Sequence, residues 1–160
     1  MGLAWDGIYF WENNYARAYE WAVDHCKKGP AVIGAIINLG LCLNLTDYGA
    51  KEELEFGYNI LKTDCENFRI KLPENRNIKD NSDLLVRELD CAVIQRIHKY
   101  RSGADLRAYD SVRGVFVEGN QVYPNSGFME KTHTQLCIIN PNCIKGYFNA
   151  QNNNNDFIRI

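Results

Sequence analysis

The residues best suited to chemistry lie near the end of the chain, where one histidine is followed by two cysteines. His133 and Cys137 fall in a stretch typical of a β-strand, and Cys143 comes shortly after. Residues 133, 135 and 137 of a strand share one face, so a zinc site with one imidazole and two thiolates is one hypothesis. Zinc sites usually contain more closely spaced ligand pairs, and we therefore predict no metal site. A Cys137–His133 nucleophilic pair is also disfavoured, because side chains two pleats apart are roughly 7 Å from each other.

The remaining histidines and cysteines form no further pattern of this kind. His25 and His98 lie in helical stretches without a second ligand four residues on, and the six cysteines include no pair separated by two residues. Four cysteines lie in apolar or amphipathic stretches, where cysteine acts as a small hydrophobic residue. Met1 is followed by neither a basic region nor an apolar run, which favours a cytoplasmic protein with reduced thiols. Walker and Rossmann glycine loops are absent from the sequence.

The strongest motif is Gly7-Ile8-Tyr9-Phe10, which precedes an alanine-rich helical stretch. This segment resembles the second signature of the ADP-ribosyltransferase superfamily, in its diphtheria-toxin and poly(ADP-ribose) polymerase branch. It is similar to uncharacterised bacterial members with a Gly-Ile-Tyr-Phe-Trp-Glu run, and the resemblance extends through residues 109–116 and 131–135. The resemblance implies an α+β fold with a mixed, mostly antiparallel split sheet and flanking helices. It also implies NAD-dependent transfer of ADP-ribose to a protein or nucleic acid, as in toxin-type effectors.

The resemblance assigns catalytic roles to three residues. Tyr9 matches the tyrosine that stacks on nicotinamide, a contact worth about 0.5–1.5 kcal/mol beyond the buried area. A residue that opens a late strand holds the ribose hydroxyls; it is usually Glu in the family, and the matching residue here is Gln135. An amide can orient a ribose, but it cannot act as a base. Glu118 is therefore the reserve acid, with Glu130 as a second nearby carboxylate.

Further residues are expected to contact NAD. Gly7 would let the dinucleotide approach the backbone, Phe10 and His133 would line the site, and Arg113 would face the diphosphate. Residue types alone leave other interpretations open: Tyr9 and Phe10 as core residues, Gln135 as an outward polar residue of a half-buried sheet, His133 as a hydrogen-bonded surface residue, and Arg113 in a surface ion pair.

One expected feature of the family is not found in the sequence. Family members carry a His-Gly or an Arg on an opening strand several tens of residues before the Gly-Ile-Tyr-Phe strand, and only six residues precede Gly7 here. This difference, together with Gln135, supports an alternative function. In that alternative the chain is a catalytically degenerate module that binds a partner or a nucleotide on the same fold.

Hydrophobic periodicity predicts the elements that position these residues. Strands are expected over residues 7–11, 31–39, 111–119, 132–139 and 143–148, with residues 41–45 as a continuation of the second. Helices are expected from Asn13 or Asn14 to about residue 28, from Thr46 or Asp47 to about residue 64, and from Ser82 or Asp83 to about residue 103. Residues 71–82 have the composition of a surface loop. This order predicts an α+β fold with a largely antiparallel sheet.

Length and composition limit the function classes. The 160 residues, 46% of them hydrophobic and 12% aromatic, predict one domain over residues 1–149 and an Asn-rich tail over 150–160. No apolar stretch reaches the roughly 20 residues of a membrane span, so no membrane partner is expected. A net charge of -2 argues against a mainly electrostatic nucleic-acid binder. Strands near the C-terminus leave a sheet edge through which a homodimer could form.

Overall fold

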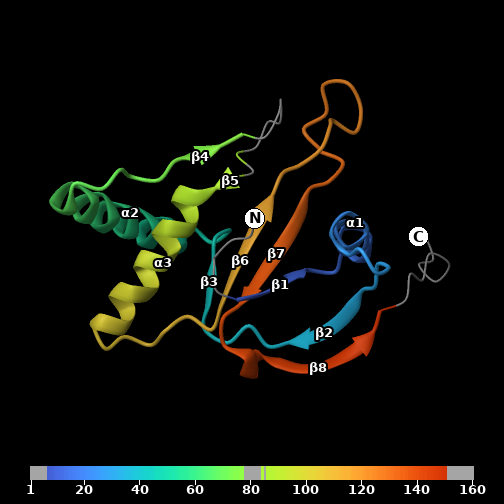
Figure 1. Cartoon of the computed structure of the whole chain (residues 1–160), viewed down its shortest axis with the longest axis horizontal. Coiled ribbons are helices and arrows are strands. Elements are labelled where there is room, and N and C mark those ends of the chain that lie inside the picture. The colour runs from blue at the N-terminus through green and yellow to red at the C-terminus, as the bar shows by residue number, and fades with distance from the viewer. Residues whose placement is uncertain (1–6, 78–83, 85, 151–160) are drawn as a thin grey trace.

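The computed structural model describes residues 7–77, 84 and 86–150 (Figure 1). Helices and strands are mixed along these residues, which confirms the α+β class. The expected N-cap at Ser82 or Asp83, and the Asn-rich tail beyond residue 150, lie outside the described residues. None of the helices in the described ranges is long and apolar enough to span a membrane.

A four-stranded sheet in the order β1-β7-β6-β3 forms the centre of the fold. β7 (His133–Ile138) runs antiparallel to both β1 (Ile8–Trp11) and β6 (Ser111–Phe116), while β3 (Cys42–Asn44) pairs with β6 in parallel. The sheet is therefore mixed and mostly antiparallel, as expected. Its order places the first strand of the chain directly beside β7.

A separate two-stranded ribbon pairs β2 (Ile33–Ile37) with β8 (Ile144–Asn149), and a short 3₁₀ helix (Pro141–Cys143) leads into β8. A strand forms within the predicted range 31–39, but it is not the buried strand that its apolar composition indicates, because Ile33 and Ile36 are 62% and 63% exposed. Among the described residues β2 pairs only with β8, so each of the two strands keeps one unpaired edge.

Residues 41–45 do not continue β2, which corrects the sequence prediction. The chain turns at Gly40, whose φ of +61° is in the left-handed region. The carboxylate of Asp110 accepts a hydrogen bond of 2.8 Å from the Leu41 backbone N–H beside this turn. The turn therefore sends β3 into the central sheet rather than into the ribbon.

The first two helices begin close to the predicted positions, but the third begins only at Glu88, because residues 86–87 of the predicted helix form a strand. α1 (Tyr15–His25) starts after Asn14, whose side chain accepts a hydrogen bond of 3.0 Å from the Arg17 backbone N–H, which confirms the predicted cap. α2 (Tyr48–Phe68) and α3 (Glu88–Gly103) pack closely, since a Cβ at Gly57 would lie 2.5 Å from Ile97. The predicted loop over residues 71–82 contains β4 (Asn75–Arg76), which pairs with β5 (Val86–Arg87).

The central sheet is covered on both faces by different elements (Figure 1). We call one the helix face, because its buried residues pack on Ala50 of α2 and Ile94 of α3; they are Leu43, Val112, Phe116 and Cys137. We call the other the ribbon face, because Leu136 and Ile138 pack there on Ile37 and Ile144 of the ribbon. Each strand residue near the predicted site therefore faces one of two separate cores.

Candidate functional site

Strand register brings four of the polar and aromatic residues onto the helix face. Trp11 of β1 lies opposite Gln135 of β7, Tyr9 lies opposite Cys137, and His133 lies opposite Phe116 of β6. Directly opposed residues of antiparallel strands share a face, so these side chains are on the side that carries Cys137 and Phe116. We call this group the Gln135 cluster; its members are Tyr9, Trp11, His133 and Gln135.

His133 is held rigidly within the cluster. Its ring is stacked on Phe116, with centroids 5.6 Å apart and planes 7° apart, and the residue is 4% exposed. Nδ1 lies 2.8 Å from the Lys131 carbonyl oxygen, which can only accept, so Nδ1 carries the proton. His133 is thus hydrogen-bonded, as the alternative interpretation held, but it is a core residue and not a surface residue.

Gln135 takes its orientation from His133. In the neutral imidazole Nε2 is an acceptor, and the Gln135 Nε2 lies 3.1 Å from it, so the side-chain amide donates that hydrogen bond. The other end of the amide, Oε1, is buried and has no hydrogen-bond partner among the described residues. Gln135 is therefore partly buried, with one polar atom satisfied and one unsatisfied.

Two more buried polar atoms near the cluster lack a partner within the described part of the chain. They are Nε1 of Trp11, across the strand from Gln135, and Nε of Arg17 at the start of α1. A buried polar group without a partner costs about 1–3 kcal/mol, and such groups mark positions where a water or ligand binds. The Trp11 atom can only donate and the Gln135 atom can only accept, so a primary carboxamide would complement both.

Glu118 is not a free carboxylate. Arg17 donates to it across 2.7 Å, and the two side chains are 17% and 19% exposed. Arg17 also pairs with Glu20, whose second oxygen pairs with Lys131. The Lys131 ammonium and the Arg17 guanidinium hold the pKa of Glu20 below its ordinary value. The expected reserve acid is therefore part of an ion-pair network that closes the end of the sheet beside α1.

Two of the expected NAD contacts lie on the opposite side of the sheet. Phe10 packs in the ribbon-face core, and Arg113 donates to Glu12 across 2.8 Å, as the ion-pair interpretation held. Successive strand residues alternate between faces, so Tyr9 and Phe10 cannot line one site from one strand. Gly7 has a structural role, because a Cβ there would lie 2.3 Å from the Cys137 sulfur.

Sequence reasoning missed Trp11 and Arg17. A signal for Trp11 was present, since it lies two residues after Tyr9 and a strand places both on one face. No local pattern indicates Arg17, because its position depends on the contact between α1 and residues 118–131, which are far away in the sequence.

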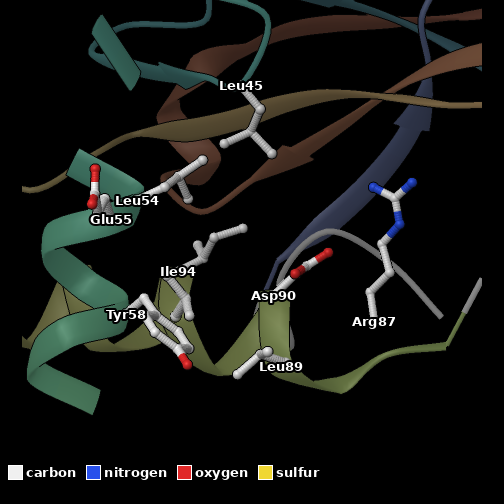
Figure 2. Close-up of a pocket in the computed structure, with 9 residues that line it drawn as sticks. Leu45, Leu54, Glu55, Tyr58, Arg87, Leu89, Asp90 and Ile94 are labelled. Atoms are coloured by element: carbon white, nitrogen blue, oxygen red, sulfur yellow. The ribbon is translucent and has the colours of Figure 1, made fainter. Parts of the chain in front are cut away.

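An apolar cavity of about 420 Å³ lies elsewhere, where α2 and α3 meet Leu45 (Figure 2). Figure 2 shows Leu54, Tyr58 and Ile94 around it, with Arg87 and Asp90 on one side. None of the predicted site residues lines this cavity. Its lining residues Leu45, Leu54 and Ile94 belong to the helix-face core, against which Tyr9 also packs. The Arg87 guanidinium, also in the lining, lies 4.1 Å above the Phe116 ring.

Comparisons with protein-family models, curated proteins and solved structures found no match to this chain. The resemblance to ADP-ribosyltransferases therefore depends on the residues of this chain alone. No group of three potential metal ligands occurs within the described ranges. Cys143 packs in the ribbon-face core, whereas His133 is on the helix face.

Proposed function

We propose that the chain is an ADP-ribosyltransferase-like domain that binds NAD on the helix face of its central sheet. The observation that carries the proposal is the pair of buried, unpartnered atoms in the described chain, Trp11 Nε1 and Gln135 Oε1, on opposed strand positions. The carboxamide of nicotinamide has a carbonyl that accepts from Trp11 and an amino group that donates to Gln135. Tyr9 lies on the same face and supplies the aromatic surface for the ring.

The proposed reaction replaces one bond at the ribose anomeric carbon with another. The bond from that carbon to the nicotinamide nitrogen breaks, and its electron pair leaves with nicotinamide. A nucleophilic atom of the acceptor then bonds the carbon and releases its proton to water. Gln135 Oε1 has two lone pairs, so it can also accept from a ribose hydroxyl and place a negative dipole beside the developing positive charge. No proton is assigned to Gln135, because an amide is not a base.

A second candidate function is a catalytically degenerate binding module. The observation that favours it is the state of the carboxylates: Gln135 replaces the usual Glu, and Glu118 is paired with Arg17 across 2.7 Å. Such a module would bind NAD without cleaving it. The two functions share the binding site and differ only in turnover.

Two measurements on the full chain separate these functions. The rise in melting temperature with NAD measures binding, and release of nicotinamide measures cleavage. Binding with release supports the transferase, and binding without release supports the module. If NAD neither stabilises the chain nor is cleaved, both functions are rejected.

A matched pair of variants tests the assigned atoms. Trp11→Phe removes the indole N–H while keeping an aromatic ring, and we expect NAD affinity to fall about 3- to 10-fold, since a hydrogen bond contributes about 0.5–1.5 kcal/mol. Tyr123→Phe in an exposed loop is the control and should bind NAD like the wild type. Equal NAD affinities for the two variants would show that the Trp11 indole N–H does not bind NAD.

A further inference from the structure

One side of α1 carries a row of residues that begins at the ion pair with Glu118 and ends at the surface. Arg17, Trp21 and His25 follow each other at four-residue spacing, which places them on one side of a helix. The Trp21 and His25 rings are stacked in parallel, with centroids 4.3 Å apart and planes 9° apart. We call these three residues the α1 strip.

The α1 strip is continuous with the Gln135 cluster. The Trp21 ring contacts the Trp11 ring at a centroid distance of 5.7 Å, and Trp11 carries the buried N–H assigned above to NAD. α1 follows β1 directly and lies beside the end of the sheet (Figure 1). An acceptor bound along the strip would therefore reach the ribose of an NAD molecule held by the cluster.

The outer end of the strip offers stacking and positive charge together. Trp21 is 45% exposed and His25 is also exposed. The parallel arrangement of the two rings allows another flat ring to extend the stack. Lys27 and Lys28 follow His25 by two and three residues and are exposed, so two cationic side chains leave the chain just beyond the stacked rings. Flat rings beside cationic groups are the features that bind unpaired bases and their phosphates.

We propose that the acceptor is a single-stranded nucleic acid, with one base stacked on the α1 strip. This inference depends on the proposed function. A base in a duplex is covered by its neighbours, so the strip selects unpaired bases. A ring nitrogen or an exocyclic amine of the base bonds the ribose anomeric carbon and gives its proton to water. Nicotinamide leaves with the electron pair of the broken bond.

Binding is tested with a fluorescein-labelled oligothymidylate of about 12 nucleotides, a length in the range that such surfaces cover. Fluorescence anisotropy is measured with the full chain and with Trp21→Leu and His25→Leu. Stacking of one base contributes about 1–3 kcal/mol, so we expect Kd to rise about 5- to 100-fold in each variant. Val23→Ala is the control, because Val23 is 54% exposed on another side of the same helix; its Kd should stay within about twofold of wild type.

The melting-temperature rise with NAD is measured on the same proteins, which separates the two proposals. If both strip variants lose oligonucleotide binding while their melting-temperature rise with NAD is unchanged, the α1 strip binds the oligonucleotide as proposed. If the wild type does not bind the oligonucleotide, or if the control loses binding equally, the strip proposal is overturned even where NAD binds. Failure of NAD to bind rejects the proposed function instead, whatever the oligonucleotide does. Finally, labelled ADP-ribose must appear on a single-stranded oligonucleotide that contains all four bases, since thymine alone has no exocyclic amine. Transfer only to added protein would also overturn the proposal.

Discussion

His133 and Gln135, two residues apart on β7, are joined by a hydrogen bond of 3.1 Å between their Nε2 atoms. The Lys131 carbonyl accepts a hydrogen bond from the Nδ1–H of His133, which leaves Nε2 of the neutral imidazole as an acceptor. The Gln135 amino group must then point at His133, and its carbonyl oxygen must point away. One backbone carbonyl thus sets the direction of the atom on which the proposed NAD site depends.

Replacement of His133 tests this orientation. His133→Phe keeps a ring to stack on Phe116 but leaves the Gln135 amino group without an acceptor, so we expect the free energy of unfolding in urea to fall by about 1–3 kcal/mol. The melting-temperature rise with NAD should become smaller, because the amide no longer has a fixed direction. The control is His98→Phe, since His98 Nε2 has no hydrogen-bond partner among the described residues. Equal losses for both variants would contradict the role given to His133.

The contact between Gly7 and Cys137 predicts a destabilised variant. A Cβ at residue 7 would lie 2.3 Å from the Cys137 sulfur, so Gly7→Ala should lower the free energy of unfolding by about 1–3 kcal/mol. The double variant with Cys137→Ala should recover part of this loss, because the obstructing sulfur is gone. Gly146→Ala serves as the control, since no atom lies within 4 Å of its added Cβ. If Cys137→Ala does not reduce the loss of unfolding free energy in Gly7→Ala, the clash with the sulfur is not its cause.

The ion pairs of Glu20 predict a specific acid dependence. Lys131 and Arg17 keep the pKa of Glu20 below its ordinary value of 4.5. A lowered pKa means that the charged carboxylate stabilises the fold fully above about pH 4.5. This contribution is lost as the pH falls through the folded-state pKa. The difference in unfolding free energy between wild type and Glu20→Gln should therefore be constant near neutral pH and shrink below 4.5. Added salt should reduce it, because Glu20 is partly exposed. A difference that does not change with pH would exclude this ion-pair contribution.

The sequence predicted the local elements better than their arrangement. Asn14 was recognised as a helix cap because capping depends on the next few residues. The pairing of β7 with β1 joins residues more than a hundred positions apart, such as Tyr9 with Cys137. Nothing in the order of the strands specifies these pairings.

In the candidate site, too, alternation along one strand can be predicted from the sequence, whereas contacts between distant strands cannot. Tyr9 and Gln135 do lie on one face, as the resemblance required, but Phe10 and Arg113 lie on the other. Alternation along a strand would have excluded Phe10 from a site that contains Tyr9. The burial of His133 could not be foreseen, since it results from Phe116 on the neighbouring strand.

Thiol reactivity should follow burial. The six cysteines, all within the described residues, form no disulfide; only Cys26 is exposed, whereas Cys91, Cys137 and Cys143 are buried. Burial raises the pKa of the Cys42 and Cys91 thiols, which lowers the fraction of reactive thiolate. A chromogenic disulfide reagent should therefore show one fast thiol in the folded chain, and Cys26→Ser should remove that phase. A fast phase that persists in this variant would contradict the lower exposure of the other five thiols.

Tyr109 predicts a loss of stability at alkaline pH. Burial, and then the hydrogen bond to the Glu53 carboxylate and its negative charge, raise the pKa of Tyr109 from 10.0 to about 12. Because the folded-state pKa is raised, the stabilisation by the neutral hydroxyl is complete below 10.0 and is lost as the pH rises through about 12. Tyr109→Phe removes the hydrogen bond, which should cost about 1–3 kcal/mol below pH 10.0.

Urea unfolding at several pH values measures how far the free energy of unfolding of Tyr109→Phe falls below that of the wild type; we call this difference the deficit. It should become smaller above 10.0, since the wild type then loses the contribution that the variant lacks. Arg101 lies 4.4 Å above the Tyr109 ring and pairs with Glu53 across 3.1 Å, so the phenylalanine ring keeps that cationic contact and the change is confined to the hydroxyl. Tyr123→Phe, in an exposed loop, should show no deficit. A Tyr109→Phe deficit that stays constant or grows above 10.0 would contradict a protonated Tyr109 bound to Glu53.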